Sequence, residues 1–175
     1  MTPEFSRPVR VDTLGTATRE LSIGADAAER DAIAARFGLL AVDRLAADLS
    51  LTRNGDAVTA TGTLKALVTQ SCIATSEPVP AKLAEPFTIL FRPHPDAAAD
   101  EEIELSEGEL DVTFYDGASI DLGEAVAETL SLSLDPYPRC PDAEAALQAA
   151  GVLSEEQAKP PGALAGLKDL LTKPN

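Results

Sequence analysis

Few residues in this chain could carry covalent or metal chemistry, and they are far apart in the sequence. The 175 residues include two cysteines, Cys72 and Cys140, and one histidine, His94, which stands between two prolines. A catalytic cysteine needs a base within hydrogen-bond reach, and no local pattern around either cysteine indicates one. A structural zinc ion takes four Cys or His ligands, more than these three residues supply. We therefore expect no catalytic residue, no metal site and no cofactor.

Carboxylates are the abundant chemical group. Eight of them lie between residues 96 and 111, with no Lys or Arg among them. Their spacing does not follow a calcium loop with its central glycine, and the chain contains no glycine-rich phosphate loop. Such a block is typical of a solvated, flexible loop. The candidate partner-binding residues within it are Asp100, Glu101, Glu102, Glu104, Glu107 and Glu109.

The charge is strongly uneven along the chain, whose formal net charge is -15. Residues 1–95 contain 10 Lys or Arg and 11 Asp or Glu, whereas residues 96–175 contain 4 and 18. Such a surface repels phosphate backbones and attracts basic proteins. It could also serve solubility alone. We expect a basic protein partner and no DNA.

Direct RNA contact would require a basic face made from the near-neutral first half. The residues that could form it are Arg7, Arg10, Arg19, Arg44 and Arg53. If these arginines are instead scattered and paired with acids, the RNA-binding alternative loses its support.

The expected compartment is the cytoplasm. No run of 18 apolar residues is present, and residues 1–10 lack the apolar core of a secretory signal, so we expect no membrane association. Two cysteines do not make a disulfide framework, so two buried thiols are favoured over a bridge.

Helix-end signals are clear at one segment in particular. Asp26 followed by Glu29 resembles a capping box, and Gly38 is typical of a helix C-terminus, which together predict a helix over residues 27–37. Similar signals predict helices over residues 121–134 and 142–150.

Alternation of apolar and polar residues predicts the strands. The pattern occurs over residues 5–23, 39–53, 58–69, 79–91 and 109–115. The Asn54-Gly55 pair between two such runs is a strong hairpin signal.

These elements predict an α+β fold. We expect an antiparallel β-meander sheet with two to three helices packed against it, a flexible acidic loop and a C-terminal tail. Residues 1–155 would form a single α+β domain and residues 156–175 a flexible tail.

The tail contains a short amphipathic segment. Leu164, Leu167 and Leu170, followed by Leu171, recur at helical spacing. An isolated helix of this length is marginal in water. We expect it to order only when docked, either on its own domain or on a partner, and Leu164, Leu167 and Leu170 are therefore candidate partner-binding residues.

One set of motifs occurs in a characteristic order. A cysteine precedes Glu-Pro, Ile-Asp-Leu-Gly-Glu follows, and Pro-x-Pro-x-Cys comes last; the residues are Cys72, Glu77, Pro78, Asp121, Glu124, Pro138 and Cys140. This order resembles the YceD-like family of large ribosomal RNA subunit accumulation proteins, from about Phe5 to Lys168.

The resemblance implies a non-enzymatic factor that supports large ribosomal subunit biogenesis and rRNA accumulation. Its partner would be a basic ribosomal protein or a large-subunit precursor particle. The alternatives are an RNA-binding protein acting in rRNA processing through the arginines named above, and a metal-dependent enzyme. Some family members carry Cys-x-x-Cys at the first cysteine, whereas here the second position is Thr75. No metal or redox role is therefore carried over, and Cys72 and Cys140 are interpreted as spatial neighbours where the sheet meets the C-terminal helix.

Overall fold

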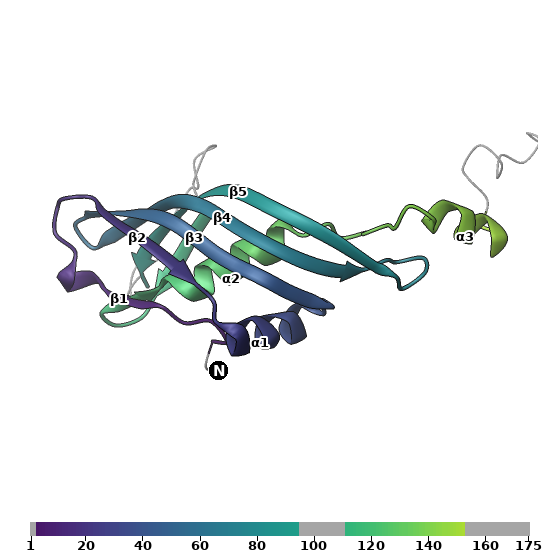
Figure 1. Ribbon diagram of the computed structural model, residues 1–175. Coiled ribbons are helices and arrows are strands. Elements are labelled where there is room, and N and C mark those ends of the chain that lie inside the picture. The colour runs from purple at the N-terminus through teal and green to yellow at the C-terminus, as the bar shows by residue number, and fades with distance from the viewer. Residues whose placement is uncertain (1–2, 95–110, 153–175) are drawn as a thin grey trace, which may run out of the picture.

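The computed structural model describes residues 3–94 and 111–152, and it consists of a long twisted sheet with two helices beneath it (Figure 1). The strands are β1 (Pro8–Arg10), β2 (Arg19–Gly24), β3 (Ala41–Asn54), β4 (Ala57–Ser71), β5 (Pro78–Pro93), β6 (Asp111–Tyr115) and β7 (Ser119–Asp121). The helices are α1 (Ala27–Phe37), α2 (Leu122–Ser133) and α3 (Ala143–Ala149), with a 3-10 turn at Val11–Thr13. The main sheet has the order β2-β3-β4-β5-β6, and β1 pairs with β7 in a separate two-stranded sheet. The predicted α+β class is confirmed.

Local signals place α1 where the sequence predicts it. The side chain of Asp26 accepts the backbone N–H of Glu29, and the Glu29 carboxylate accepts the N–H of Asp26. Gly38 ends the helix with a positive φ of 65°, a conformation that costs little only for glycine.

The central hairpin follows from Asn54 and Gly55. Asn54 pairs with Ala57, and Gly55 adopts a positive φ of 62° in the turn between β3 and β4. Beyond the turn buried residues alternate with more exposed ones along most of both strands. One face of the sheet therefore belongs to the core, and the other faces solvent.

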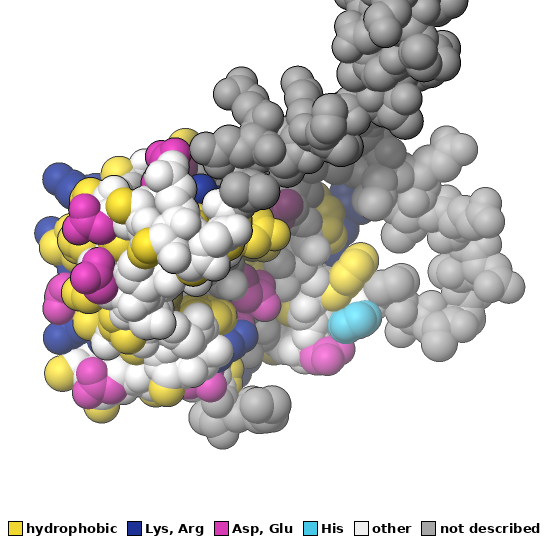
Figure 2. Space-filling model, turned by 90° about the vertical axis from the view of Figure 1, so that its right-hand side faces the viewer, with side chains coloured by type: hydrophobic (Ala, Val, Ile, Leu, Met, Phe, Trp, Pro, Cys, Tyr) yellow, Lys and Arg dark blue, Asp and Glu magenta, His cyan; other side chains and the backbone are white. Residues whose placement is uncertain are grey.

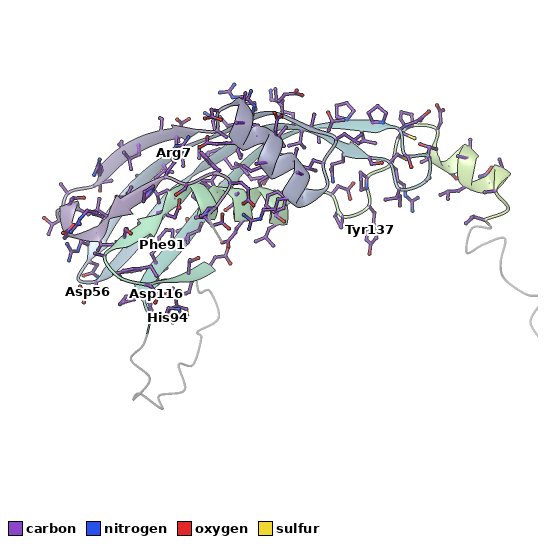
Figure 3. The ribbon with its side chains drawn as sticks, turned by 90° about the horizontal axis from the view of Figure 1, so that it is seen from below. Arg7, Asp56, Phe91, His94, Asp116 and Tyr137 are labelled. Atoms are coloured by element: carbon purple, nitrogen blue, oxygen red, sulfur yellow. The ribbon has the colours of Figure 1, made fainter. Side chains whose placement is uncertain are left out.

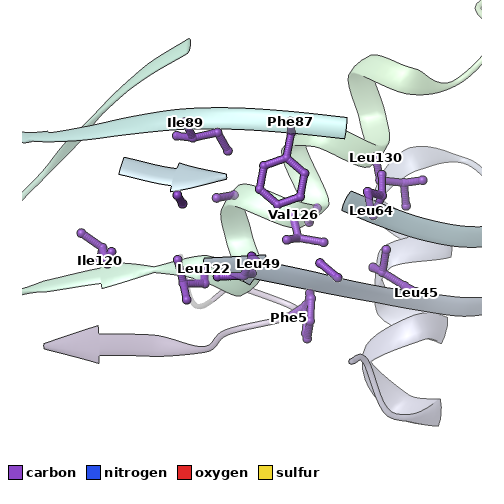
Figure 4. Close-up of a cluster of buried hydrophobic side chains, with 14 of the residues drawn as sticks. Phe5, Leu45, Leu49, Leu64, Phe87, Ile89, Ile120, Leu122, Val126 and Leu130 are labelled. Carbon is purple, nitrogen blue, oxygen red and sulfur yellow. The ribbon is translucent and has the colours of Figure 1, made fainter. Parts of the chain in front are cut away.

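The core joins this buried sheet face to both helices and to the N-terminal segment. Phe5, Leu45, Leu64, Val126 and Leu130 belong to one buried cluster, shown in Figure 4. Except for Val126 and Leu130, these residues lie far apart in sequence. Their burial is the main force that packs the helices under the sheet.

The last strand departs from the predicted meander. β6 pairs with β5 in parallel, with Ile89 opposite Asp111, so the purely antiparallel prediction is wrong for this strand. A parallel neighbour needs a crossover of a dozen or more residues, and the 17 residues between Pro93 and Asp111 are enough for one.

Two further predictions are refined. The alternating residues 5–23 form two strands, because β1 leaves the main sheet to pair with β7 while β2 pairs with β3. α3 lies beyond the end of the sheet (Figure 1), where its first residue, Ala143, packs beside the two cysteines and not against the main core. Within the described residues, no helix is long and apolar enough to cross a membrane.

Candidate functional site

The motif residues of the chain separate into two places in the structure. Asp121 and Glu124 lie at the start of α2, under the sheet, whereas Cys72, Glu77 and Cys140 lie at the far end of the β4–β5 hairpin. Each place has its own network of contacts.

At the first place Asp121 holds the N-terminal segment against α2. Its Oδ1 accepts the backbone N–H of Gly123 at 3.0 Å and that of Arg7 at 2.7 Å, and its Oδ2 accepts the Ser6 hydroxyl. The segment passes so close that a Cβ on Gly123 would lie 2.8 Å from the carbonyl carbon of Phe5. The carboxylate is thus a helix cap that also fixes a distant stretch of chain.

Two arginines complete this network. Arg7 donates to both carboxylate oxygens of Glu29, at 2.6 and 2.8 Å, and its guanidinium lies 4.6 Å from the centre of the Phe5 ring. The hydrogen bond from Arg7 lowers the pKa of Glu29. Arg36, at the end of α1, bridges Glu4 and Glu124 at 2.9 and 2.7 Å. We infer that Asp121 and Glu124 have a structural role.

The second place is a cysteine cluster made of Cys72, Thr75, Glu77 and Cys140. The backbone N–H of Cys140 donates to Cys72 Sγ at 3.2 Å, and Thr75 Oγ1 lies 3.2 Å from Cys140 Sγ. The N–H of Cys72 donates to the Glu77 carbonyl at 2.8 Å, which closes the turn before Pro78 begins β5. Both thiols are free and buried. The interpretation of the two cysteines as neighbours at this junction is confirmed.

The contacts within the cluster separate the acidities of the two thiols. Hydrogen bonds from the Cys140 backbone and the Thr75 hydroxyl lower the pKa of Cys72. At Cys140 the Thr75 hydroxyl acts in the same direction, but the hydrogen bond with Cys72, burial and Glu77 outweigh it, so the pKa of Cys140 is raised. One thiolate therefore forms before the other.

We expect this difference to appear in a pH titration of the folded chain. The pKa of Cys72 is lower in the folded state than in the unfolded state, where a thiol has a pKa of about 8.5. Ionisation of Cys72 thus stabilises the fold fully above that unfolded value, and the contribution is lost as the pH falls through the lowered pKa. Ultraviolet thiolate absorbance should show one early step, which Thr75→Val moves to higher pH. Two thiols titrating together near the ordinary value would contradict the assignment.

Beside the cysteine cluster lies a groove between the C-terminal end of α1, the end of β4 and the segment after α2. Its volume is about 400 Å³. It is lined by Phe37, Gly38, Leu39, Gln70, Ser71, Ile73, Ser131, Leu134, Asp135, Pro136 and Pro138. The amide of Gln70 donates to the Asp135 carbonyl at 2.8 Å, and Pro138 accepts the N–H of Ile73 at 2.9 Å. These bonds fix the lip of the groove to the sheet.

The histidine is not part of either place. His94 stacks on Phe114 with ring centres 5.2 Å apart. In Figure 3 it lies near Asp116 and far from Tyr137, which belongs to the segment between α2 and Cys140. Among the described residues, no three His, Cys, Asp or Glu side chains are placed to hold a metal ion.

Three of the five arginines proposed for RNA contact are paired with carboxylates. Arg7 pairs with Glu29, Arg10 with Asp12 and Arg53 with Asp56. On the side shown in Figure 2, cationic and acidic side chains are interspersed. This arrangement does not favour direct RNA binding.

The remaining predicted site residues lie outside the described part of the chain. They are Asp100, Glu101, Glu102, Glu104, Glu107, Glu109, Leu164, Leu167 and Leu170. Conversely, Arg36 and the groove were missed by sequence reasoning. The partners of Arg36, Glu4 and Glu124, are 32 and 88 residues away, and the groove joins three separate segments, so no local pattern indicates either one.

A comparison with family models gives one match. The model described as large ribosomal RNA subunit accumulation protein YceD matches residues 60–171, which include the cysteine cluster, α2 and most of the groove. No curated protein and no solved structure matches the chain.

Proposed function

This chain belongs to the YceD family of large ribosomal RNA subunit accumulation proteins, and on that premise we propose that it is a non-enzymatic assembly factor. It would support large ribosomal subunit biogenesis by binding a basic ribosomal protein or a large-subunit precursor particle. Its compartment would be the cytoplasm, where such particles are assembled.

The main support is the uneven charge. Residues 96–175 hold 18 acidic and 4 basic side chains. Long-range attraction from such a surface speeds encounter with a basic protein and disfavours wrong partners. A basic ribosomal protein that has not yet bound rRNA carries the complementary charge.

Direct RNA binding is the second candidate, and a metal-dependent enzyme the third. Three of the five arginines that the RNA candidate needs are already engaged by carboxylates, which weakens their attraction for phosphate. No specific observation on the described residues favours the enzyme.

The proposal predicts salt-sensitive binding to large-subunit ribosomal proteins. Fluorescence titration of the full chain with purified basic proteins of the subunit should show an affinity that falls as salt rises, since exposed charges are screened. Converting Asp100, Glu101, Glu102, Glu104, Glu107 and Glu109 to their amides should weaken binding by roughly tenfold or more, on the order of 1.4 kcal/mol.

A matched control separates this effect from net charge. It carries six amide substitutions at exposed acids elsewhere, at Glu20, Asp31, Asp43, Glu85, Asp116 and Glu144. The control variant should keep most of the affinity if the six acidic residues between Asp100 and Glu109, called the acidic run below, make the contact. An affinity that is equal at low and high salt would contradict the electrostatic mechanism.

A further inference from the structure

The groove beside the cysteine cluster has a largely apolar lining, made by Phe37, Leu39, Ile73, Leu134, Pro136 and Pro138. Ile73 lines the groove and is 52% exposed. Leu40, Leu132 and Tyr137 each follow a lining residue in the sequence, and their side chains are 54, 82 and 69% exposed. These are four of the seven large hydrophobic side chains exposed among the described residues. An apolar groove bordered by exposed side chains of this kind gains stability when it is covered.

One carboxylate lies in the groove, and another lies on the helix that precedes it. Asp135 lines the groove after the end of α2, and Glu128 is an exposed residue of α2 one turn before Leu132. Within the described residues neither carboxylate forms an ion pair. Burial and the neighbouring Glu124 raise the pKa of Glu128 more than Arg36 lowers it, so a further cation brought here would stabilise its charged form.

We propose that this groove is the docking site of the chain's own C-terminal segment, residues 163–173. The proposal is independent of the proposed function, because it concerns a contact within one chain. It assigns an occupant to the groove and a role to the leucines of the tail.

The chemistry of the segment matches both features of the groove. Leu164, Leu167, Leu170 and Leu171 would form one apolar stripe. Lys168 and Lys173 accompany the stripe and outnumber Asp169, the one acid of the segment, and they would complement Glu128 and Asp135. When docked, these leucines would be buried against the apolar lining of the groove. This burial would stabilise a helix that is too short to form on its own.

The chain is long enough to make the contact. Between Pro138, at the lip of the groove, and Val152, the last described residue before the tail, the seven-residue α3 limits the span to at most about 38 Å. The connector from Val152 to Leu164 reaches up to about 43 Å when extended. The stripe can therefore return to the groove of its own chain.

Tethering favours the segment over a free competitor. A flexible connector of this length holds its end at an effective concentration in the millimolar range, above that of a second copy in solution. A weak intrinsic affinity is then enough for occupancy in one chain.

The contact can be tested in the full chain by methyl NMR. Ile73 is the isoleucine that lines the groove, so its methyl group is a specific probe. In a sample labelled at Ile and Leu methyl groups we expect NOE cross-peaks between Ile73 and tail leucines. These peaks should vanish, and the Ile73 methyl resonance should shift, in the double variant Leu167→Asp, Leu170→Asp.

Two further samples complete the test. Leu67→Asp changes an exposed leucine between Arg44 and Lys82 on the solvent face of the sheet, and it should leave the Ile73 signals unchanged. A mixture of labelled and unlabelled chains reports contacts between copies. Absence of tail-dependent cross-peaks to Ile73, or cross-peaks that occur only between copies, would overturn the proposal.

Discussion

Replacing Phe5 with alanine will lower the free energy of unfolding by about 3–5 kcal/mol. The ring is fully buried in the core beside α2, although it lies in a segment outside the main sheet. Its removal leaves a cavity and also takes away the surface on which the Arg7 guanidinium stacks. Urea denaturation followed by circular dichroism measures the change.

Phe5→Leu serves as the matched control, because it keeps an apolar side chain at the site. We expect it to cost about 1–2 kcal/mol. If Phe5→Ala changed the stability by less than Phe5→Leu, the N-terminal segment would not be part of the core.

Gly123→Ala will destabilise the protein by about 1–3 kcal/mol, the usual cost of overpacking. The added Cβ would lie 2.8 Å from the Phe5 carbonyl carbon and 3.0 Å from the Arg7 nitrogen, and these are backbone atoms that cannot rotate away. The segment must shift, which also breaks the hydrogen bond from Arg7 to Asp121.

The control for this variant is Gly15→Ala. Gly15 has no atom within 4 Å of the added Cβ and does not adopt a positive φ. A substitution there should be neutral or slightly stabilising, because it only restricts the unfolded chain. Equal effects of the two variants in the same urea experiment would contradict a close approach at Gly123.

These two predictions explain why the Ile-Asp-Leu-Gly-Glu motif could be recognised but not interpreted from the sequence. Its cap at Asp121 is a local signal. The reason for a glycine two residues later lies in Phe5, more than a hundred residues away. Sequence spacing alone does not reveal such a contact.

The fold was predictable where the determinants are local. Asp26, Glu29 and Gly38 fix α1, and the turn at Gly55 fixes the register of β3 and β4. The parallel pairing of β6 was not predictable in this way, because strand direction depends on where a crossover returns and not on the residues of the strand itself.

The candidate site divides in the same way. The order of the motifs allowed Cys72 and Cys140 to be neighbours but did not fix their distance, and the structure brings them into contact. The groove beside them combines the end of α1 with residues of β4 and the segment after α2. Its apolar lining exists only where these three segments meet, so the sequence of no single segment could have indicated it.

The most direct measurement of the central claim is the ratio of large- to small-subunit rRNA after depletion of this protein, with sucrose-gradient profiles of the particles. Membership of the family predicts a selective fall in large-subunit rRNA and abnormal precursor particles, both restored by the wild-type chain. The chain with amide substitutions in the acidic run should restore them less well than the matched control. Unchanged rRNA ratios and unchanged profiles in depleted cells would contradict a role in large-subunit assembly.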